Sequence, residues 1–170
     1  MPNGRTHSAE DIAKMLFLLV KDTPQRNFEL FERAMNPSKI NLTKDQYAEF
    51  KSKFLSKARL YFDTMALWAI LNAKRKDQRY DCLLAEFEKL VMPPEPTSAG
   101  LRRLADIKDA MADIEQQIIK NAKVLPWCRN WLLDIGLNET NPYTLMMLVQ
   151  IFRIHFNSYR EFIQDAHPHV

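Results

Sequence analysis

Three polar side chains, Asp63, His155 and Tyr159, are candidates for chemistry because each lies on an otherwise apolar helical pattern. An unpaired carboxylate is costly to bury, and Arg59 lies one helical turn before Asp63, at a spacing that allows an ion pair. This spacing indicates either a structural ion pair or a solvent-facing position. The alternative is a buried polar contact that lines a pocket, with Arg153 or His155 opposite Asp63.

His155 and Tyr159 lie one helical turn apart near the end of the chain. Histidine titrates near neutral pH, so this pair could contact a ligand or carry a proton. The other interpretation is a histidine at the edge of the core, hydrogen-bonded to the backbone or to a hydroxyl. Together with Asp63, these two residues are the candidate ligand contacts of an apolar core.

A second group of candidates consists of basic residues in the middle of the chain, where the phosphates of a nucleic acid could bind. Residues 51–92 hold nine basic and five acidic side chains. On a helix, Lys53 and Lys57 share a face, whereas Lys51 and Arg59 point elsewhere. The alternative is a solvated helix surface. The candidate nucleic-acid contacts are Lys51, Lys53, Lys57, Arg59, Lys74, Arg75, Lys76 and Arg79.

The sequence lacks the common signatures of catalysis and of cofactor binding. With only three glycines, it contains no glycine-rich phosphate loop and no nucleophile elbow. It also lacks the HExxH zinc motif and the paired Glu-x-x-His motifs of di-iron bundles. We therefore expect a protein that is not an enzyme, with no catalytic residue, no cofactor and no metal site.

Cys82 and Cys128 are too few and too far apart for a disulfide framework, and their apolar neighbours predict buried free thiols. No apolar run is long enough to span a membrane, and the early run at residues 15–20 lacks the flanks of a signal peptide. These features predict an intracellular, cytoplasmic protein in a reducing compartment. The net charge of +3 neither demands nor excludes an anionic partner.

The elements that must position these residues are predicted to be helices. Thr43 and Gln46 form a capping box, which opens a helical pattern that runs to about Lys76. Residues 60–71 are apolar on nearly every side, as expected of a central helix covered by its neighbours. Unbroken, about 33 residues would span roughly 50 Å, so the molecule is elongated or this helix kinks or ends early.

Further helical patterns, each with start or stop signals, surround this long one. They begin after Ser8, after Thr23, at Arg79, at Thr97 or Ser98, after Leu125, and at Pro142. The pattern that begins at Thr97 or Ser98 runs to about Val124, and Gly136 closes the next one. The proline-rich segment 93–100 is an internal linker. No stretch alternates as a strand does, so we predict an all-α, single-domain bundle (1–170) of about six or seven helices, with one long central helix and no β-sheet.

This pattern favours a non-enzymatic helical interaction or scaffold protein that acts through a protein partner or by self-association. The grounds are the absence of catalytic motifs and the long amphipathic helices rich in Phe, Met and Trp. One alternative is a nucleic-acid-binding helical protein, or a small ribonucleoprotein subunit, that uses the basic middle segment. A third hypothesis is the binding of an apolar small ligand in the bundle core.

Overall fold

The computed structural model describes residues 7–35, 42–92, 97–120, 123–166 and 168. Within these ranges the chain forms seven α-helices, one π-helical segment and no β-strand, so the predicted all-α class is confirmed. The elements are α1 (Ala9–Lys21), α2 (Thr23–Met35), α3 (Lys44–Lys74), α4 (Tyr80–Val91), α5 (Ser98–Asp113), η2 (Ile114–Ile119), α6 (Val124–Leu133) and α7 (Pro142–Ala166).

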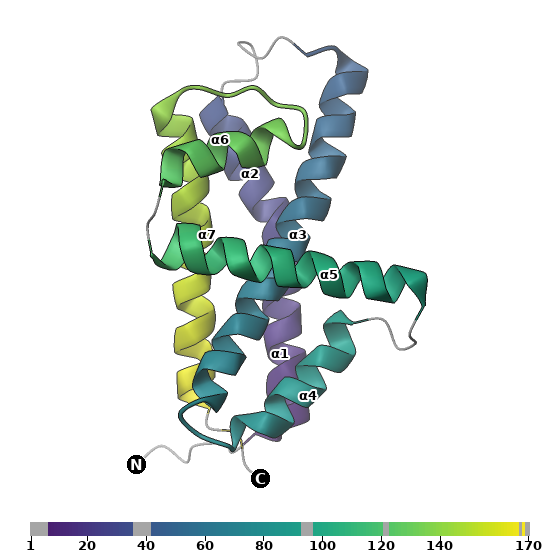
Figure 1. Ribbon diagram of the computed structural model, residues 1–170, viewed down its shortest axis with the longest axis vertical. Coiled ribbons are helices and arrows are strands. Elements are labelled where there is room, and N and C mark those ends of the chain that lie inside the picture. Colours follow the sequence, from purple (N-terminus) through teal and green to yellow (C-terminus); the bar gives the residue numbers. More distant parts are fainter. Residues whose placement is uncertain (1–6, 36–41, 93–96, 121–122, 167, 169–170) are drawn as a thin grey trace.

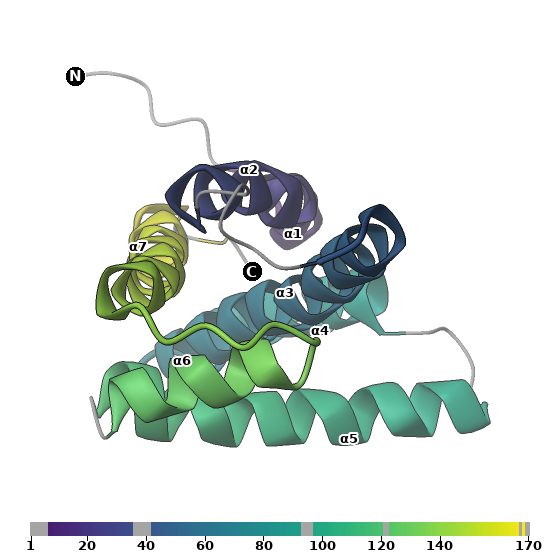
Figure 2. The ribbon, with the colours of Figure 1, turned by 90° about the horizontal axis from the view of Figure 1, so that it is seen from above.

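The two longest helices, α3 and α7, run along the long axis of the molecule and lie between two pairs of shorter helices (Figures 1 and 2). The α1–α2 pair covers one side, and α5 and α6 lie on the other. α4 packs most extensively against α1 and also contacts α3. α5 crosses α3, and its N-terminal half projects beyond the bundle (Figure 1).

α3 is unbroken over its 31 residues, which at about 1.5 Å each span roughly 46 Å. The predicted capping box is present, because the Thr43 hydroxyl accepts from the Gln46 amide while the Gln46 side chain accepts from the Thr43 amide. In the segment 60–71, which is apolar on nearly every side, most side chains are buried, and Leu60, Trp68 and Leu71 are half-buried. The long central helix is thus confirmed, and the molecule is elongated along it.

The boundaries of other helices also follow local signals in the sequence. The Ser8 hydroxyl caps α1 by accepting from the Asp11 amide. Gly136 lies in the left-handed region, with φ of 94°, and ends α6 in a Schellman motif. In this motif the Leu137 amide donates to the Leu132 carbonyl, and the Gly136 amide donates to the Leu133 carbonyl.

The core is one cluster of buried apolar side chains drawn from α1 to α7, and aromatic rings fill its centre. Phe152 of α7 lies at the middle of these rings, 5.4–5.9 Å from its neighbours. Its ring neighbours are Tyr61, Phe62, Trp127 and Trp131. Since these residues come from three helices, the aromatic cluster joins α3, α6 and α7.

The helix predicted to run from Thr97 or Ser98 to about Val124 is divided in the structure. α5 ends at Asp113, and the backbone continues as the π-helical segment η2, in which the Lys120 amide donates to the Glu115 carbonyl five residues earlier. Apolar spacing alone does not distinguish this wider turn from an α-helix, because Ile114 and Ile118 are buried in either geometry.

The linker predicted at 93–100 ends earlier in the structure than the sequence predicts. The Thr97 hydroxyl accepts from the Gly100 amide, so α5 already begins at Ser98. Residues 93–96 of the predicted linker lie outside the described part of the chain.

Only one of the two cysteines is buried as predicted. Cys128 is fully buried, and this burial raises the pKa of its thiol to about 12. Cys82 is exposed, so the prediction for it was wrong. Its apolar sequence neighbours Leu83 and Leu84 face the core, whereas Cys82 lies one position earlier and about 100° away around α4.

Candidate functional site

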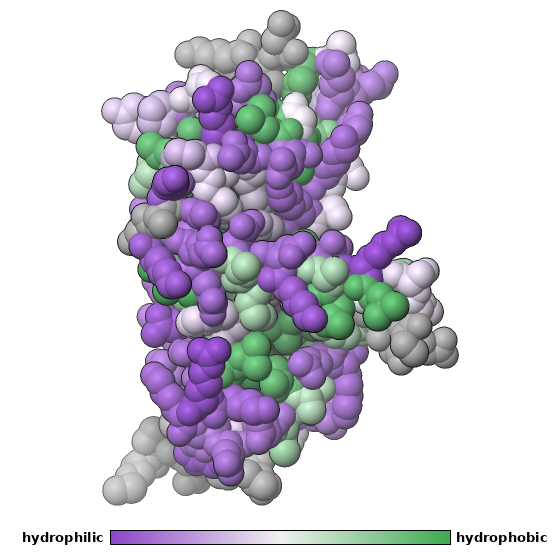
Figure 3. Space-filling model, in the orientation of Figure 1, coloured by the Kyte–Doolittle hydropathy of each residue, from purple (hydrophilic) through white to green (hydrophobic). Residues whose placement is uncertain are grey.

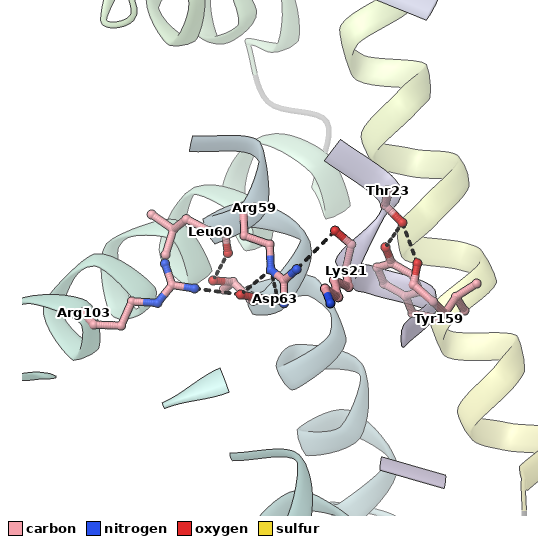
Figure 4. Close-up of polar contacts among 9 residues, drawn as sticks. Lys21, Thr23, Arg59, Leu60, Asp63, Arg103 and Tyr159 are labelled. Carbon is pink, nitrogen blue, oxygen red and sulfur yellow. Dashed lines mark hydrogen bonds and ion pairs between the residues drawn. The ribbon is translucent and has the colours of Figure 1, made fainter. Parts of the chain in front are cut away.

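Asp63, in the middle of α3, is 2% exposed and lies between two arginines (Figure 4). Arg59 Nε is 2.9 Å from Oδ1 and 3.0 Å from Oδ2, so the pair predicted from the spacing is present. Arg103 of α5 donates from Nη2 to Oδ2 at 2.7 Å. The alternative expected from the sequence has Arg153 or His155 opposite Asp63, and the structure places Arg103 there instead.

This ionic cluster links three helices. Arg59 Nη1 donates to the Lys21 carbonyl at the end of α1, at 3.2 Å, and its guanidinium lies 5.1 Å from the centre of the Phe17 ring. Burial raises the pKa of the Asp63 carboxyl, and the two guanidiniums beside it act in the opposite direction. The Asp63 carboxylate is held by two guanidiniums of the chain itself. The arrangement therefore suits a structural tie between α1, α3 and α5 better than an acid or base that exchanges protons with a substrate.

His155 and Tyr159 belong to a second polar cluster, which lies between α7 and α2. Asn27 Nδ2 donates to the Thr23 carbonyl at 2.9 Å and lies 2.8 Å from His155 Nε2. The Tyr159 hydroxyl donates to Thr23 Oγ1 at 3.4 Å, and Thr23 Oγ1 donates to the Leu19 carbonyl at 2.7 Å. This cluster contains no charged partner.

The surroundings of His155 favour a neutral ring. Nε2 lies 2.8 Å from Asn27 Nδ2 and 3.2 Å from Asn27 Oδ1, and the imidazole packs edge-on against the Phe62 ring at 5.2 Å. Burial lowers the pKa of His155 below its ordinary value. Burial likewise raises the pKa of the Tyr159 hydroxyl far above its ordinary value. Both groups therefore keep their neutral forms at neutral pH and serve as hydrogen-bonding groups, His155 at the edge of the core and Tyr159 within it.

The eight basic residues singled out in the sequence lie along α3 and its turn into α4, and most of them have partners. Five of them form ion pairs with carboxylates at 2.5–2.9 Å. These pairs are Lys53–Glu49, Lys57–Asp134, Arg59–Asp63, Lys74–Asp81 and Arg79–Asp77. A paired cation presents less charge to a phosphate than a free one.

The first four of these basic residues point to different sides of α3. Lys51 lies over the Phe28 ring of α2, Lys57 bonds to the Trp131 carbonyl of α6, and Arg59 points to α1. Lys51 and Lys74 are 23 positions apart on one helix, or about 35 Å. The eight side chains therefore do not share one face. Binding along a nucleic acid would use cations that do share one face.

Among the cavities bordered by described residues, the three that follow are not lined by Asp63, His155 or Tyr159. A cavity of about 320 Å³ lies between the end of α3, the start of α4 and α7. An apolar one of about 380 Å³ lies between α6 and the start of α7, and a third of about 120 Å³ lies between α3 and the turn at Gly136.

The described residues contain no group of three or more His, Cys, Asp or Glu side chains that could hold a metal ion. In the same ranges, no helix combines the length and the apolar character that a membrane span requires.

Several polar residues of these sites could not be identified from the sequence. Arg103 is 40 positions from Asp63, and Asn27 is 128 positions from His155. No local spacing links such pairs. Arg160, which lines the cavity of about 320 Å³, was not identified from the sequence either. Its position one residue after the buried Tyr159 places a cation near the edge of an apolar face.

No protein-family model matches this sequence, and neither a curated protein nor a solved structure is significantly similar to it.

Proposed function

We propose that this chain is a non-enzymatic helical interaction protein that associates with another protein chain through the exposed half of α5, residues 98–106. The observation that carries this proposal is that no residue of this half is buried. Its two leucines, Leu101 and Leu104, are 63% and 38% exposed. Amphipathic helices ordinarily bury such side chains, and exposed apolar surface of this kind is typical of interaction sites.

The neighbouring surface is also apolar. Figure 3 shows hydrophobic surface gathered around the projecting part of α5 and over the adjacent α4. The exposed large apolar side chain of α4 is Leu90, which is 36% exposed, and Val91 and Met92 at its end are half-buried. A partner that covered this surface would remove apolar area from water at roughly 25 cal/mol per Å².

A second copy of the chain is the simplest partner for this surface. A two-fold axis through one apolar patch covers that patch in both copies at once. Pairing of the α5 segments in this way would cover Leu101 and Leu104 of each copy.

Size-exclusion chromatography with light scattering at increasing concentration tests the second copy. We expect a mass that rises from 20.0 kDa towards twice that value, and the double variant Leu101→Glu/Leu104→Glu should remain at the lower mass. The matched control is Leu30→Glu, which changes a leucine that is 51% exposed on α2. It should behave like the wild type.

A photo-crosslinking residue at position 101, compared with one at position 30, extends the test to other proteins. Crosslinks from position 101 to this chain or to one defined protein are expected, with few from position 30. The proposal is wrong if the wild type and the double variant have the same mass at every concentration and the two crosslinking positions give the same products.

A further inference from the structure

We propose that the cavity between the end of α3, the start of α4 and α7 binds a phosphate dianion, carried by a small phosphate monoester. The cavity has a volume of about 320 Å³, at the lower end of the range of small-molecule sites. Arg160 reaches it from α7, and Lys76 and Arg79 reach it from the turn after α3. This site is separate from the α5 surface described above and does not depend on it.

The cavity is built from regular helical spacing on its two long walls. On α3, Asn72 lies on the same side of the helix as Ala69 and Ala73, and Lys76 follows in the turn after the helix. The two alanines leave the space that larger side chains would fill. On α7, Arg160 and Gln164 lie four residues apart. α7 therefore presents one cation and one side-chain amide to the cavity, and α3 with the turn that follows it presents Asn72 and Lys76.

The charges in the cavity are not balanced. Among the described lining residues the carboxylate is Asp77, which accepts from Arg79 Nε at 2.7 Å and from Arg79 Nη2 at 2.5 Å. Among the described residues, Lys76 and Arg160 form no ion pair with a carboxylate. With three cations and one anion, the lining side chains have a net charge of +2.

Arg160 provides the most specific indication of an anion. Its guanidinium lies 5.8 Å from the centre of the Phe156 ring, which holds it against α7. Its Nε is buried and has no hydrogen-bond acceptor among the described residues. A buried donor without an acceptor is costly, and a turn of the guanidinium towards the cavity would let an oxygen of a bound anion accept from it. The C-terminal dipole of α3 accounts for cations such as Lys74 at that helix end, but not for Arg160 on α7.

The chemistry of the cavity favours phosphate over a single carboxylate. The guanidinium fork matches the oxygens of both groups, but a net charge of +2 matches the roughly −1.5 to −2 charge of a phosphate monoester at neutral pH. The side-chain amides of Asn72 and Gln164 can donate to further oxygens. The walls at Ala69, Ala73 and the Tyr80 ring leave apolar space beside the cations, which suits a small organic group attached to the phosphate.

Isothermal titration calorimetry with inorganic phosphate and with phenyl phosphate tests the proposal, with sodium chloride and acetate at matched ionic strength as controls. We expect both phosphates to bind, phenyl phosphate more tightly, and chloride and acetate to bind not at all or far more weakly. Arg160→Met keeps the side-chain stem on Phe156 but removes the fork, and it should weaken phosphate binding by about tenfold. Lys76→Met should weaken it as well.

The matched control is Arg75→Met, because Arg75 is an exposed neighbour that does not line the cavity. It should leave binding unchanged. If Arg160→Met does not fold, Arg160→Lys keeps the charge without the fork and serves the same comparison. Equal phosphate affinity in the wild type, in the folded Arg160 variant and in Lys76→Met would overturn the proposal, as would equal responses to phosphate and to chloride.

An unphosphorylated single-stranded oligonucleotide distinguishes the source of the phosphate. The proposal expects it to compete weakly with phenyl phosphate. Tighter binding of the oligonucleotide than of phenyl phosphate, lost in Arg160→Met, would overturn the assignment to a small monoester and favour the phosphates of a nucleic acid strand.

Discussion

α7 packs against α3 through much of its length and contributes nine buried residues, whereas α5 contributes two, Ile107 and Ala110. Both helices also carry a polar contact to the rest of the bundle. On α7 this contact is the neutral cluster of His155 with Asn27, framed by aromatic rings. On α5 it is the charged pair of Arg103 with Asp63. The helix with little buried apolar area is thus the one that is held by an ion pair.

This difference indicates two kinds of stability. The position of α7 follows from apolar burial, which is not directional and does not depend on one side chain. The C-terminal half of α5 has further ties, because Tyr61 donates to the Asp113 carboxylate at 2.5 Å and Trp68 donates to Glu115 in η2 at 3.0 Å. The N-terminal half of α5 is tied to the bundle by the Arg103–Asp63 contact and has no buried residue. Local opening of residues 98–106 should therefore require little free energy.

The largest effect is expected from Phe152→Ala, which removes the ring at the centre of the aromatic cluster. Phe152 is 1% exposed, and truncation of a buried phenylalanine costs about 3–5 kcal/mol. Urea unfolding should show this loss, and hydrogen exchange should rise in α3, α6 and α7 together. A rise confined to α7 would show that this helix is not part of the common core.

The next effect is expected from Asp63→Ala, which leaves Arg59 and Arg103 without their shared carboxylate. Removing one partner of a fully buried pair costs about 3–5 kcal/mol. Here the cost should be about 2–3 kcal/mol, because the two arginine side chains are 27% and 26% exposed and regain some hydration. Hydrogen exchange should rise most at residues 98–106. An even rise over all helices would contradict the proposed tie to α5.

A smaller effect is expected from Arg103→Met, which keeps the apolar stem but removes the contact to α5. Asp63 retains Arg59, so the loss of stability should be about 1 kcal/mol. Arg59→Met is the matched variant, since it leaves Arg103 in place. If residues 98–106 exchange faster in Arg103→Met than in Arg59→Met, the bond to α5 itself holds this half of the helix. Equal exchange in the two variants would assign the effect to the carboxylate alone.

The sequence could predict contacts between residues that lie within a few positions of each other along a helix. The capping box at Thr43, the Schellman glycine Gly136 and the Arg59–Asp63 pair are all local, and all are present. The second partner of Asp63 and the partner of His155 come from other helices, at separations of 40 and 128 residues. Helix packing brings those side chains together, and apolar periodicity specifies which face packs but not against which neighbour.

The same limit explains the cavity beside Arg160. The sequence places Lys76 and Arg160 on two separate helices, and only their packing makes one cavity. It also explains why eight basic residues that look like a cluster along the chain are divided among several sides of α3 in the structure. Charge that is local in sequence is spread around a helix by about 100° at each residue.

The smallest effect is expected from the neutral cluster of α7 and concerns pH. Burial lowers the pKa of His155 in the folded chain, whereas the unfolded chain keeps a value near 6.5. Below about pH 6.5 the unfolded state therefore binds more protons at this residue than the folded state does. Stability should be complete above that pH and should fall as the pH drops towards the lowered folded pKa.

His155→Gln isolates this contribution, because a glutamine amide can still meet Asn27 but does not titrate. Urea unfolding of both proteins at pH 7.5 and pH 5.5 should show a larger loss of stability on acidification in the wild type than in the variant. Equal losses would mean that the imidazole can be protonated in place. α7 would then tolerate a buried charge as α3 does at Asp63, and the contrast between a neutral and a charged contact would not hold.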